Sequence, residues 1–362
     1  MKYLPLKILP LFVAIALLST LSCISKRPRP LPENSLPPKT AAEISIMNYN
    51  VENLFDNIHD ENREDQTYLP LAKKQTLEHK ALCEKLEPSW LKDECLNLDW
   101  SDEVVNAKLK NIAQIINSVD DGGPDILILE EVENERILTR LNREFLSRSG
   151  YITQVLVEGP DKRGIDIALL SRLPLNGKPT LHQIPYVGEN EEDVKWMARS
   201  RGILEVPLIT PAGESLVVLG AHFPSQKNPR YWRKQAVNNL KGMIAGKEKK
   251  LMVIAGGDLN ITSIEENETG FFKGILSQVA LISHLDGCKS CAGTHNYKNS
   301  WSFLDVLMFS KNMGPMGTAP YFFAPESVQV ITSSDRPRRF NVATKVGASD
   351  HFPLYARIRR RN

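Results

Sequence analysis

An acid and an imidazole stand side by side near the end of this chain, within the stretch Gly347–Leu354. Asp350 and His351 follow a Gly-Ala-Ser turn and precede an alternating apolar run. This pattern predicts a loop that brings two chemical groups to the start of a final strand. A carboxylate and an imidazole can hold and move protons, but a lone pair of this kind is also typical of a surface loop. Polar residues elsewhere must therefore decide between the two interpretations.

Similar side chains recur where other strands are expected to end. Alternating or continuous apolar runs predict strands over 43–51, 125–131, 215–221, 251–255 and 301–310. The polar residues in or directly after these runs are Asn50, Glu52, Glu131, His222, Asp258, Asn260 and Asp305. Each one alone is commonly a cap or a turn former. Their recurrence at every strand end predicts that they form one site.

The rest of the chain indicates one α/β domain. Apolar residues at helical spacing predict helices over 101–116, 133–146 and 229–247, and two further strand pairs are expected at 151–157 with 165–170 and at 202–208 with 215–221. Strands and helices mixed without internal repeats are typical of layered α/β sheets. Residues 57–100 are charged and lack sustained periodicity, which predicts a surface insertion.

Taken together, these motifs resemble the endonuclease/exonuclease/phosphatase superfamily of metal-dependent phosphoesterases. The resemblance spans Glu43 to about Arg357 apart from the insertion. It rests on Asn-Val-Glu-Asn at 50–53, Pro-Asp-Ile-Leu-Ile-Leu-Glu-Glu at 124–131, Gly-Asp-Leu-Asn at 257–260, Leu-Asp at 304–305 and Ser-Asp-His at 349–351. It implies a four-layer α/β/β/α sandwich, in which two mixed β-sheets pack face to face with helices outside.

The resemblance also implies a role for each matched residue. Glu131, Glu52 and Asp350 are expected to lie around a divalent metal ion, Mg²⁺ or Mn²⁺. The residues expected to be catalytic are Asp258 for the attacking water, Asn50, Asn260 and His222 for the phosphate, and His351 with its partner Asp305 for a phosphoryl oxygen.

Elementary chemistry leads independently to the same assignment. A phosphodiester is anionic and repels hydroxide, so its hydrolysis needs a hard cation, a base for water and donors for the developing charge. Carboxylates and amides without a histidine-rich cluster favour Mg²⁺ or Mn²⁺ over Zn²⁺. An imidazole backed by Asp305 has a fixed tautomer and a stabilised cationic form, which suits it to an oxyanion.

Several functions remain open at this point. An endonuclease-like enzyme acting on nucleic acid comes first, followed by a phosphatase or lipid-headgroup phosphodiesterase of the same fold. A non-catalytic surface binding module is the alternative from another class, although every matched position is filled. Two sets of residues near the motifs could contact substrate or could serve only solvation and packing: the basic residues Arg199, Arg201, Lys227, Arg230 and Arg233, and the aromatic residues Tyr297 and Trp301.

The N-terminus predicts export. Lys2 and Lys7 precede a short apolar run, which is typical of a signal peptide over residues 1–22. The run ends at Cys23 in a sequence that resembles a bacterial lipobox, with Thr20 where Leu is usual. Cys23 is therefore expected to carry a lipid in the cell envelope, or the chain is secreted after an ordinary cut. A Pro-rich tether over 23–42 and a domain over 43–360 would follow.

The charge balance disfavours a dedicated nucleic-acid binder. Lys2 and Lys7 leave with the signal, so the remaining Lys and Arg equal the 43 Asp and Glu in number. Proteins that only bind nucleic acid usually carry a strongly basic face. The expected partners are thus a phosphodiester substrate and, through Cys23, the membrane, and the sequence indicates no obligate protein partner.

The other four cysteines permit two interpretations. Disulfides Cys83–Cys95 and Cys288–Cys291 fit an exported chain. The alternative is a zinc site made by His284, Cys288, Cys291 and His295, whose spacings are tolerable for that metal.

Overall fold

Two six-stranded β-sheets dominate the computed structural model, which describes residues 1, 37–288 and 290–362. The predicted signal peptide, Cys23 and most of the predicted tether lie outside these residues. No helix within the described ranges is long and apolar enough to cross a membrane.

The first sheet has the order β13-β14-β1-β2-β4-β3. Its only parallel pair is β1 with β2. The strands are β1 (Glu43–Leu54), β2 (Ile126–Val132), β3 (Thr153–Leu156), β4 (Asp166–Ser171), β13 (Tyr321–Val330) and β14 (Leu354–Arg360).

The second sheet has the order β5-β6-β7-β8-β12-β9, and its only parallel pair is β7 with β8. Its strands are β5 (Thr180–His182), β6 (Ile203–Ile209), β7 (Ser215–His222), β8 (Met252–Asp258), β9 (Ala280–Ile282) and β12 (Asp305–Ser310). A separate hairpin joins β10 (His295–Tyr297) to β11 (Ser300–Ser302).

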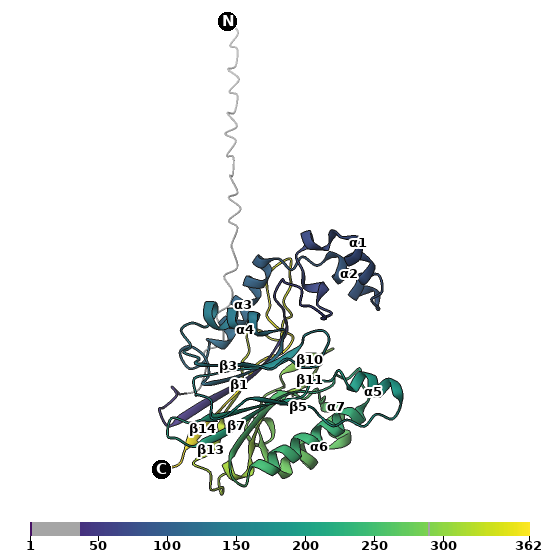
Figure 1. The fold of residues 1–362 in the computed structure, drawn as a ribbon. Helices are drawn as coiled ribbons and strands as arrows, with labels where there is room; N and C mark the ends of the chain where they lie inside the picture. The colour runs from purple at the N-terminus through teal and green to yellow at the C-terminus, as the bar shows by residue number, and fades with distance from the viewer. Residues whose placement is uncertain (2–36, 289) are drawn as a thin grey trace. The chain divides into compact units, whose positions relative to one another are not determined.

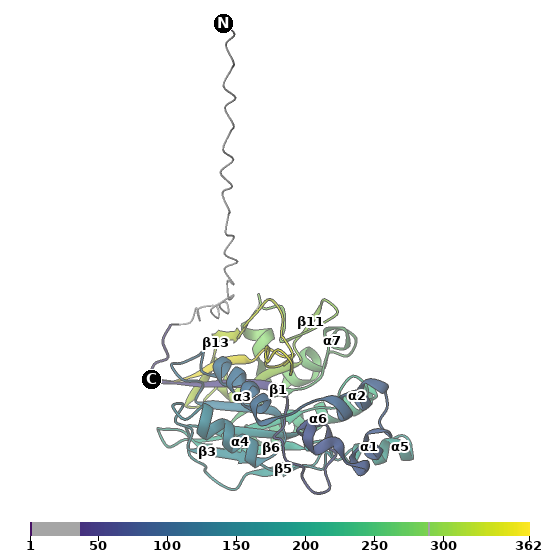
Figure 2. The same ribbon diagram turned by 90° about the horizontal axis from the view of Figure 1, so that it is seen from above.

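The two sheets pack face to face, because one buried apolar cluster contains side chains from both of them. The approach is close at Gly256 of β8, where an added Cβ would lie 2.7 Å from Ile128 Cδ1 of β2. Helices α3 (Asp102–Ile116) and α4 (Glu135–Arg140) cover the outer face of the first sheet. Helix α6 (Arg230–Lys247) covers the outer face of the second, so the layers run α/β/β/α as predicted (Figures 1 and 2).

The elements predicted from long apolar patterns are present, with ends shifted by a few residues. The run at 301–310 is a real difference, because it divides into β11 and β12 rather than forming one strand. The helix expected over 133–146 continues beyond α4 only as a π-helical turn. Short elements that the patterns did not predict include β5, β9, β13, α5 (Glu191–Met197) and α7 (Ser263–Thr269).

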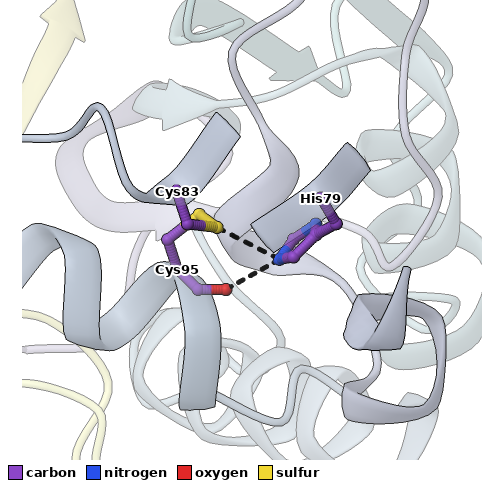
Figure 3. A group of neighbouring side chains, drawn as sticks. All are labelled: His79, Cys83 and Cys95. Atoms are coloured by element: carbon purple, nitrogen blue, oxygen red, sulfur yellow. Dashed lines mark hydrogen bonds between the residues drawn. A yellow bond between two sulfur atoms is a disulfide. The ribbon is translucent and has the colours of Figure 1, made fainter. Parts of the chain in front are cut away.

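The predicted insertion contains two short helices, α1 (Leu77–Cys83) and α2 (Ser89–Asn97), which stand apart from the sheets in Figure 1. A disulfide joins Cys83 to Cys95 and confirms the predicted bridge. His79 lies against it, with Nε2 3.0 Å from the Cys95 carbonyl oxygen (Figure 3). At the base of the insertion Tyr68 stacks on Phe55, with ring centroids 4.0 Å apart. The insertion is thus stapled internally and attached to the core by aromatic packing.

The second predicted disulfide, Cys288–Cys291, is also present, and the zinc alternative is wrong. The His284 ring stacks on Phe303 at a centroid distance of 4.7 Å and meets Phe272 edge-on. His295 instead lies beside His351, with ring centroids 4.9 Å apart. The two imidazoles therefore belong to different surroundings, and the sulfurs are bonded to each other.

Burial of His284 should make stability depend on pH. Burial, followed by the nearby Lys273, lowers the pKa of His284 from 6.5 to about 4. Between these values the unfolded chain binds a proton that the folded chain does not, so the free energy of unfolding should fall as the pH drops from 6.5 towards 4. Urea unfolding at several pH values should show a smaller fall in His284→Phe than in wild type. Equal falls in wild type and His284→Phe would contradict the prediction.

Candidate active site

Two backbone irregularities orient the acidic side chains at the ends of β1 and β2. Register shifts occur in β1 between Asn50 and Leu54 and in β2 between Glu130 and Val132. Glu52 and Glu131 at these shifts have φ of 48° and 66°, values that residues with a side chain rarely adopt. Glu130 is fully buried, whereas the Glu131 side chain keeps 19% exposure. The bulge in β2 therefore leaves Glu131 partly exposed beside the buried Glu130, whereas Glu52 at the end of β1 stays largely buried.

Asn50 links the two sheets at the centre of the site. Its Nδ2 donates to Asp258 Oδ2 at 3.0 Å and to Glu131 Oε1 at 3.4 Å. The other oxygen of Asp258 accepts the backbone N–H of Asn260 at 2.8 Å. The Asn260 amide donates to the Phe223 carbonyl at 3.0 Å. Both amides, predicted to hold phosphate, thus also fix the acids and the loop around Asp258.

His351 forms a buried pair with Asp305, with Nδ1 2.7 Å from Oδ2. Its Nε2 faces the site, 3.8 Å from both Asp258 Oδ2 and Asp350 Oδ1. Burial opposes the charged imidazole, but Asp305, Asp258 and Asp350 outweigh burial and raise the pKa of His351 well above its usual value. These surroundings therefore favour the charged form of His351, with Nε2 facing Asp258 and Asp350.

The surroundings of His222 shift its pKa in the opposite direction from that of His351. It ends β7 opposite Asp258, and its Nε2 lies 3.6 Å from Asp258 Oδ2 and 3.9 Å from Glu131 Oε1. Burial comes first among the causes that lower the pKa of His222 well below its usual value, and Arg201 and His351 add to it. These surroundings therefore favour the neutral form of His222.

The acids predicted to bind metal form the other half of the site. Arg339 bridges Glu52 Oε1 at 2.8 Å and Asp350 Oδ2 at 2.6 Å. The second oxygen of Glu52 is buried and has no hydrogen-bond partner. Burial and then Asp350 raise the pKa of Glu52 to about 7, which Lys108 and Arg339 oppose. An unpartnered carboxylate oxygen suits a hard divalent cation, which prefers oxygen ligands. Within the described residues, however, the ligand atoms that lie within 4.8 Å of one another here belong to His295, Asp350 and His351, and the set Glu52, Glu131 and Asp350 does not come that close together.

The structure thus brings all nine predicted site residues into one connected group. It also adds Arg339 and the buried Lys108, which had no predicted role, and His295, which the sequence offered only as a possible zinc ligand. Lys108 lies on the apolar face of α3, and a lysine at that spacing is a signal that the sequence did offer. Arg339 lies in an irregular segment, where periodicity carries no information, and His295 begins the short polar strand β10.

The basic and aromatic residues that the sequence offered as possible substrate contacts have different surroundings in the structure. Of the five basic residues, Arg201 lies near His222 and is largely buried, with Nε lacking a partner. The other four contact residues outside the site: Arg199 pairs with Glu64, Arg230 and Arg233 pair with Glu265, and Lys227 lies over the ring of Trp90. Trp301 stacks against Phe352 at 6.2 Å between ring centroids, which supports packing, whereas Tyr297 is 63% exposed.

The sequence pattern of the Endonuclease/Exonuclease/phosphatase family matches residues 93–360. The chain belongs to this family. It is therefore an enzyme of the phosphoesterase class, whose members hydrolyse phosphate esters. No curated protein matches the sequence well enough to count as a relative.

Solved structures of this family share the fold at low sequence identity. Zebrafish (D. rerio) TDP2 complexed with a single-strand DNA product is 14% identical, with a TM-score of 0.54 over 88% of this chain and 99% of that chain. A family protein from Bacteroides thetaiotaomicron is 16% identical, with a TM-score of 0.53 over 87% and 94%. The mannosyl-6-phosphatase Bt3783 of the same bacterium is 16% identical, with a TM-score of 0.51 over 87% and 99%.

Neighbouring glutamates at the end of β2 offer a test of the metal site. Glu131→Gln should weaken Mn²⁺ binding by about tenfold or more, because it removes a charged oxygen ligand. Glu130→Gln is the matched control: burial and then Asp305 raise the pKa of Glu130 well above its usual value, so its neutral side chain resembles glutamine. Electron paramagnetic resonance of free Mn²⁺ measures both affinities. Equal affinities for the two variants would show that Glu131 is not a ligand.

Proposed function

We propose that this protein is an exported, Mg²⁺- or Mn²⁺-dependent phosphodiesterase, most like an endonuclease in its choice of substrate. The observation that carries the proposal is the position of Asp258. This carboxylate lies between a charged imidazole, a neutral imidazole and an amide, and the acids suited to a cation lie on the other side of that amide.

Glu52, Glu131 and Asp350 are the residues that would hold the cation. When bound, a divalent cation supplies positive charge to a phosphoryl oxygen. Asn50 keeps Glu131 at a fixed distance from Asp258, because its amide donates to both carboxylates. The metal-binding and proton-handling halves of the site are therefore held in one geometry before substrate arrives.

Asp258 is the group that would orient and deprotonate the attacking water. Burial raises its pKa to about 7, with Asp305 adding to the rise and His351 opposing it. A base whose pKa lies near neutral pH combines a useful ionised fraction with a useful affinity for the proton. The hydrogen bonds from Asn50 and Asn260 hold this carboxylate in one orientation.

His351 would bind the developing negative charge on a non-bridging oxygen or protonate the leaving group. Asp305 accepts a hydrogen bond from Nδ1–H and favours the imidazolium, whose Nε2–H then faces the site. His222 donates or accepts without adding charge, which limits the total positive charge beside the phosphate. Oriented donors of this kind typically contribute about a hundredfold or more in rate.

A nucleic acid is the preferred substrate. The zebrafish TDP2 structure holds single-stranded DNA on the same fold, and Arg201 adds positive charge beside His222. A phosphatase is the second candidate, because the mannosyl-6-phosphatase Bt3783 also shares the fold. The near-neutral charge of the chain favours the second candidate only weakly, since local charge governs contact with one phosphate.

Replacement of the central groups should abolish catalysis without unfolding the protein. Asp258→Asn and His351→Ala should each lower kcat/KM by about a hundredfold or more with Mg²⁺. The assay compares bis-p-nitrophenyl phosphate, plasmid DNA, single-stranded RNA and sugar phosphates, and circular dichroism checks the fold. His182→Ala, on the edge strand β5, serves as the control. Full activity in both site variants would place the chemistry elsewhere, and hydrolysis of monoesters alone would favour the phosphatase.

We also propose that Cys23 carries a lipid that anchors the enzyme in the cell envelope. The support is the sequence alone: a basic start, an apolar run and small residues before Cys23. The expected result is membrane association and palmitate labelling in wild type, with both lost in Cys23→Ser expressed in a bacterium. Unchanged association in Cys23→Ser would refute lipidation and favour secretion after an ordinary signal cut.

A further inference from the structure

A lysine is buried directly beneath the predicted metal site. Lys108 is only 2% exposed and lies on the face of α3 that otherwise holds apolar side chains such as Val105, Leu109 and Ile112. A buried ammonium is costly unless polar partners surround it. The identity of those partners therefore indicates what the charge is for.

The partners of Lys108 are backbone carbonyls of the two segments that carry metal-binding acids. Its Nζ donates to the carbonyl of Glu52 at 2.5 Å and to the carbonyl of Ala348 at 3.3 Å. Ala348 lies two residues before Asp350. The ring of Phe340 lies below the ammonium, with its centroid 5.4 Å from Nζ. One side chain thus joins the end of β1 to the loop before β14.

The end of β1 and the loop before β14 need a contact that fixes their positions. Glu52 and Asn53 have φ of 48° and 51°, so the bulge at the end of β1 is strained. A strained backbone persists only where its surroundings fix it. Ser349 adds a second tie, because its Oγ donates to the Asn50 carbonyl at 2.6 Å. Lys108 provides the buried, charged contact to the strained residue itself.

We propose that Lys108 is a positioning residue, which fixes Glu52 and Asp350 at the spacing that a divalent cation requires. The inference rests on the proposed metal-dependent function, and it assigns to α3 a role in the site that lies beyond covering the sheet. Lys108 acts through the backbone of these residues and does not itself contact metal or substrate.

The direction in which metal affinity changes when Lys108 is replaced distinguishes a positioning role from a simple effect of its positive charge. Removal of a positive charge beside the site, taken alone, would strengthen the binding of another cation. Loss of the tie between the two acid-bearing segments would weaken it. Residues that orient metal ligands typically change affinity by about tenfold to a hundredfold. A weaker affinity after removal of Lys108 therefore identifies the positioning role.

The experiment measures Mn²⁺ affinity in the full chain for a graded series. Lys108→Met removes all donors, Lys108→Gln keeps an amide donor, and Lys108→Arg keeps donors and charge. Lys110→Met, on the exposed face of the same helix, is the matched control. We expect the dissociation constant to rise about tenfold or more in Lys108→Met, less in Lys108→Gln and least in Lys108→Arg, with Lys110→Met like wild type.

Two features of this experiment allow it to overturn the inference even if one variant does not fold or the enzyme is inactive. If Lys108→Met does not fold, the Gln and Arg variants still give the order of affinities, and an order in which Arg binds no better than Gln overturns the inference. An unchanged or tighter affinity in a folded Lys108→Met also overturns it. The readout is binding, so a wild-type protein that hydrolyses no phosphodiester would refute the proposed function while leaving the role of Lys108 to be decided by the same titration.

Discussion

The convergence of negative charge is the constraint on which this structure depends. Carboxylates from five separate segments meet at one edge of the sandwich, and several of them are buried. Unpaired ionised carboxylates in such surroundings would be very costly. The fold offsets that cost with a buried lysine, an exposed arginine and an imidazolium, which are Lys108, Arg339 and His351. Burial itself lowers the pKa of Lys108 to about 8, while Glu52, Glu131 and Asp350 oppose this change. The ammonium and the acids therefore depend on each other.

The topology explains how residues so distant in sequence meet. Each sheet contains one parallel pair, and the carboxyl ends of β1, β2, β7 and β8 carry Asn50, Glu131, His222 and Asp258. The antiparallel neighbours β12 and β14 begin at the same edge, so Asp305 and His351 arrive at the starts of strands. Stacking of the two sheets then places the ends of β1 and β8 within one hydrogen bond of each other, from Asn50 to Asp258.

The sequence predicted those parts of the site that regular strands deliver. Long apolar runs located β1, β2, β7, β8 and β14, and polar residues at their ends proved to be neighbours. Arg339 and His295 were not predictable in this way. Arg339 comes from an irregular segment and His295 from the short polar strand β10, and the positions of both depend on tertiary contacts. The division of 301–310 into two strands has the same cause: Trp301 packs on Phe352 while Asp305 pairs with Asp258, so no straight strand satisfies both. The bulges at Glu52 and Glu131 leave no compositional sign, since neither is a glycine.

The surroundings shift the pKa values of the two imidazoles in the site in opposite directions, so that His351 favours the charged form and His222 the neutral one. His351 has Asp305 on one ring nitrogen and two carboxylates near the other, and together these outweigh its burial. His222 lies at similar distances from Glu131 and Asp258, but its burial lowers its pKa, and Arg201, His351 and Arg163 lower it further. A second imidazolium would face the first across Asp258. The cationic surroundings of His222 thus keep the positive charge on His351, which leaves Asp258 with one charged and one neutral imidazole beside it. The pKa shifts thus favour a carboxylate that can accept a proton beside an imidazole that can supply one, with Asp258 Oδ2 and His351 Nε2 3.8 Å apart.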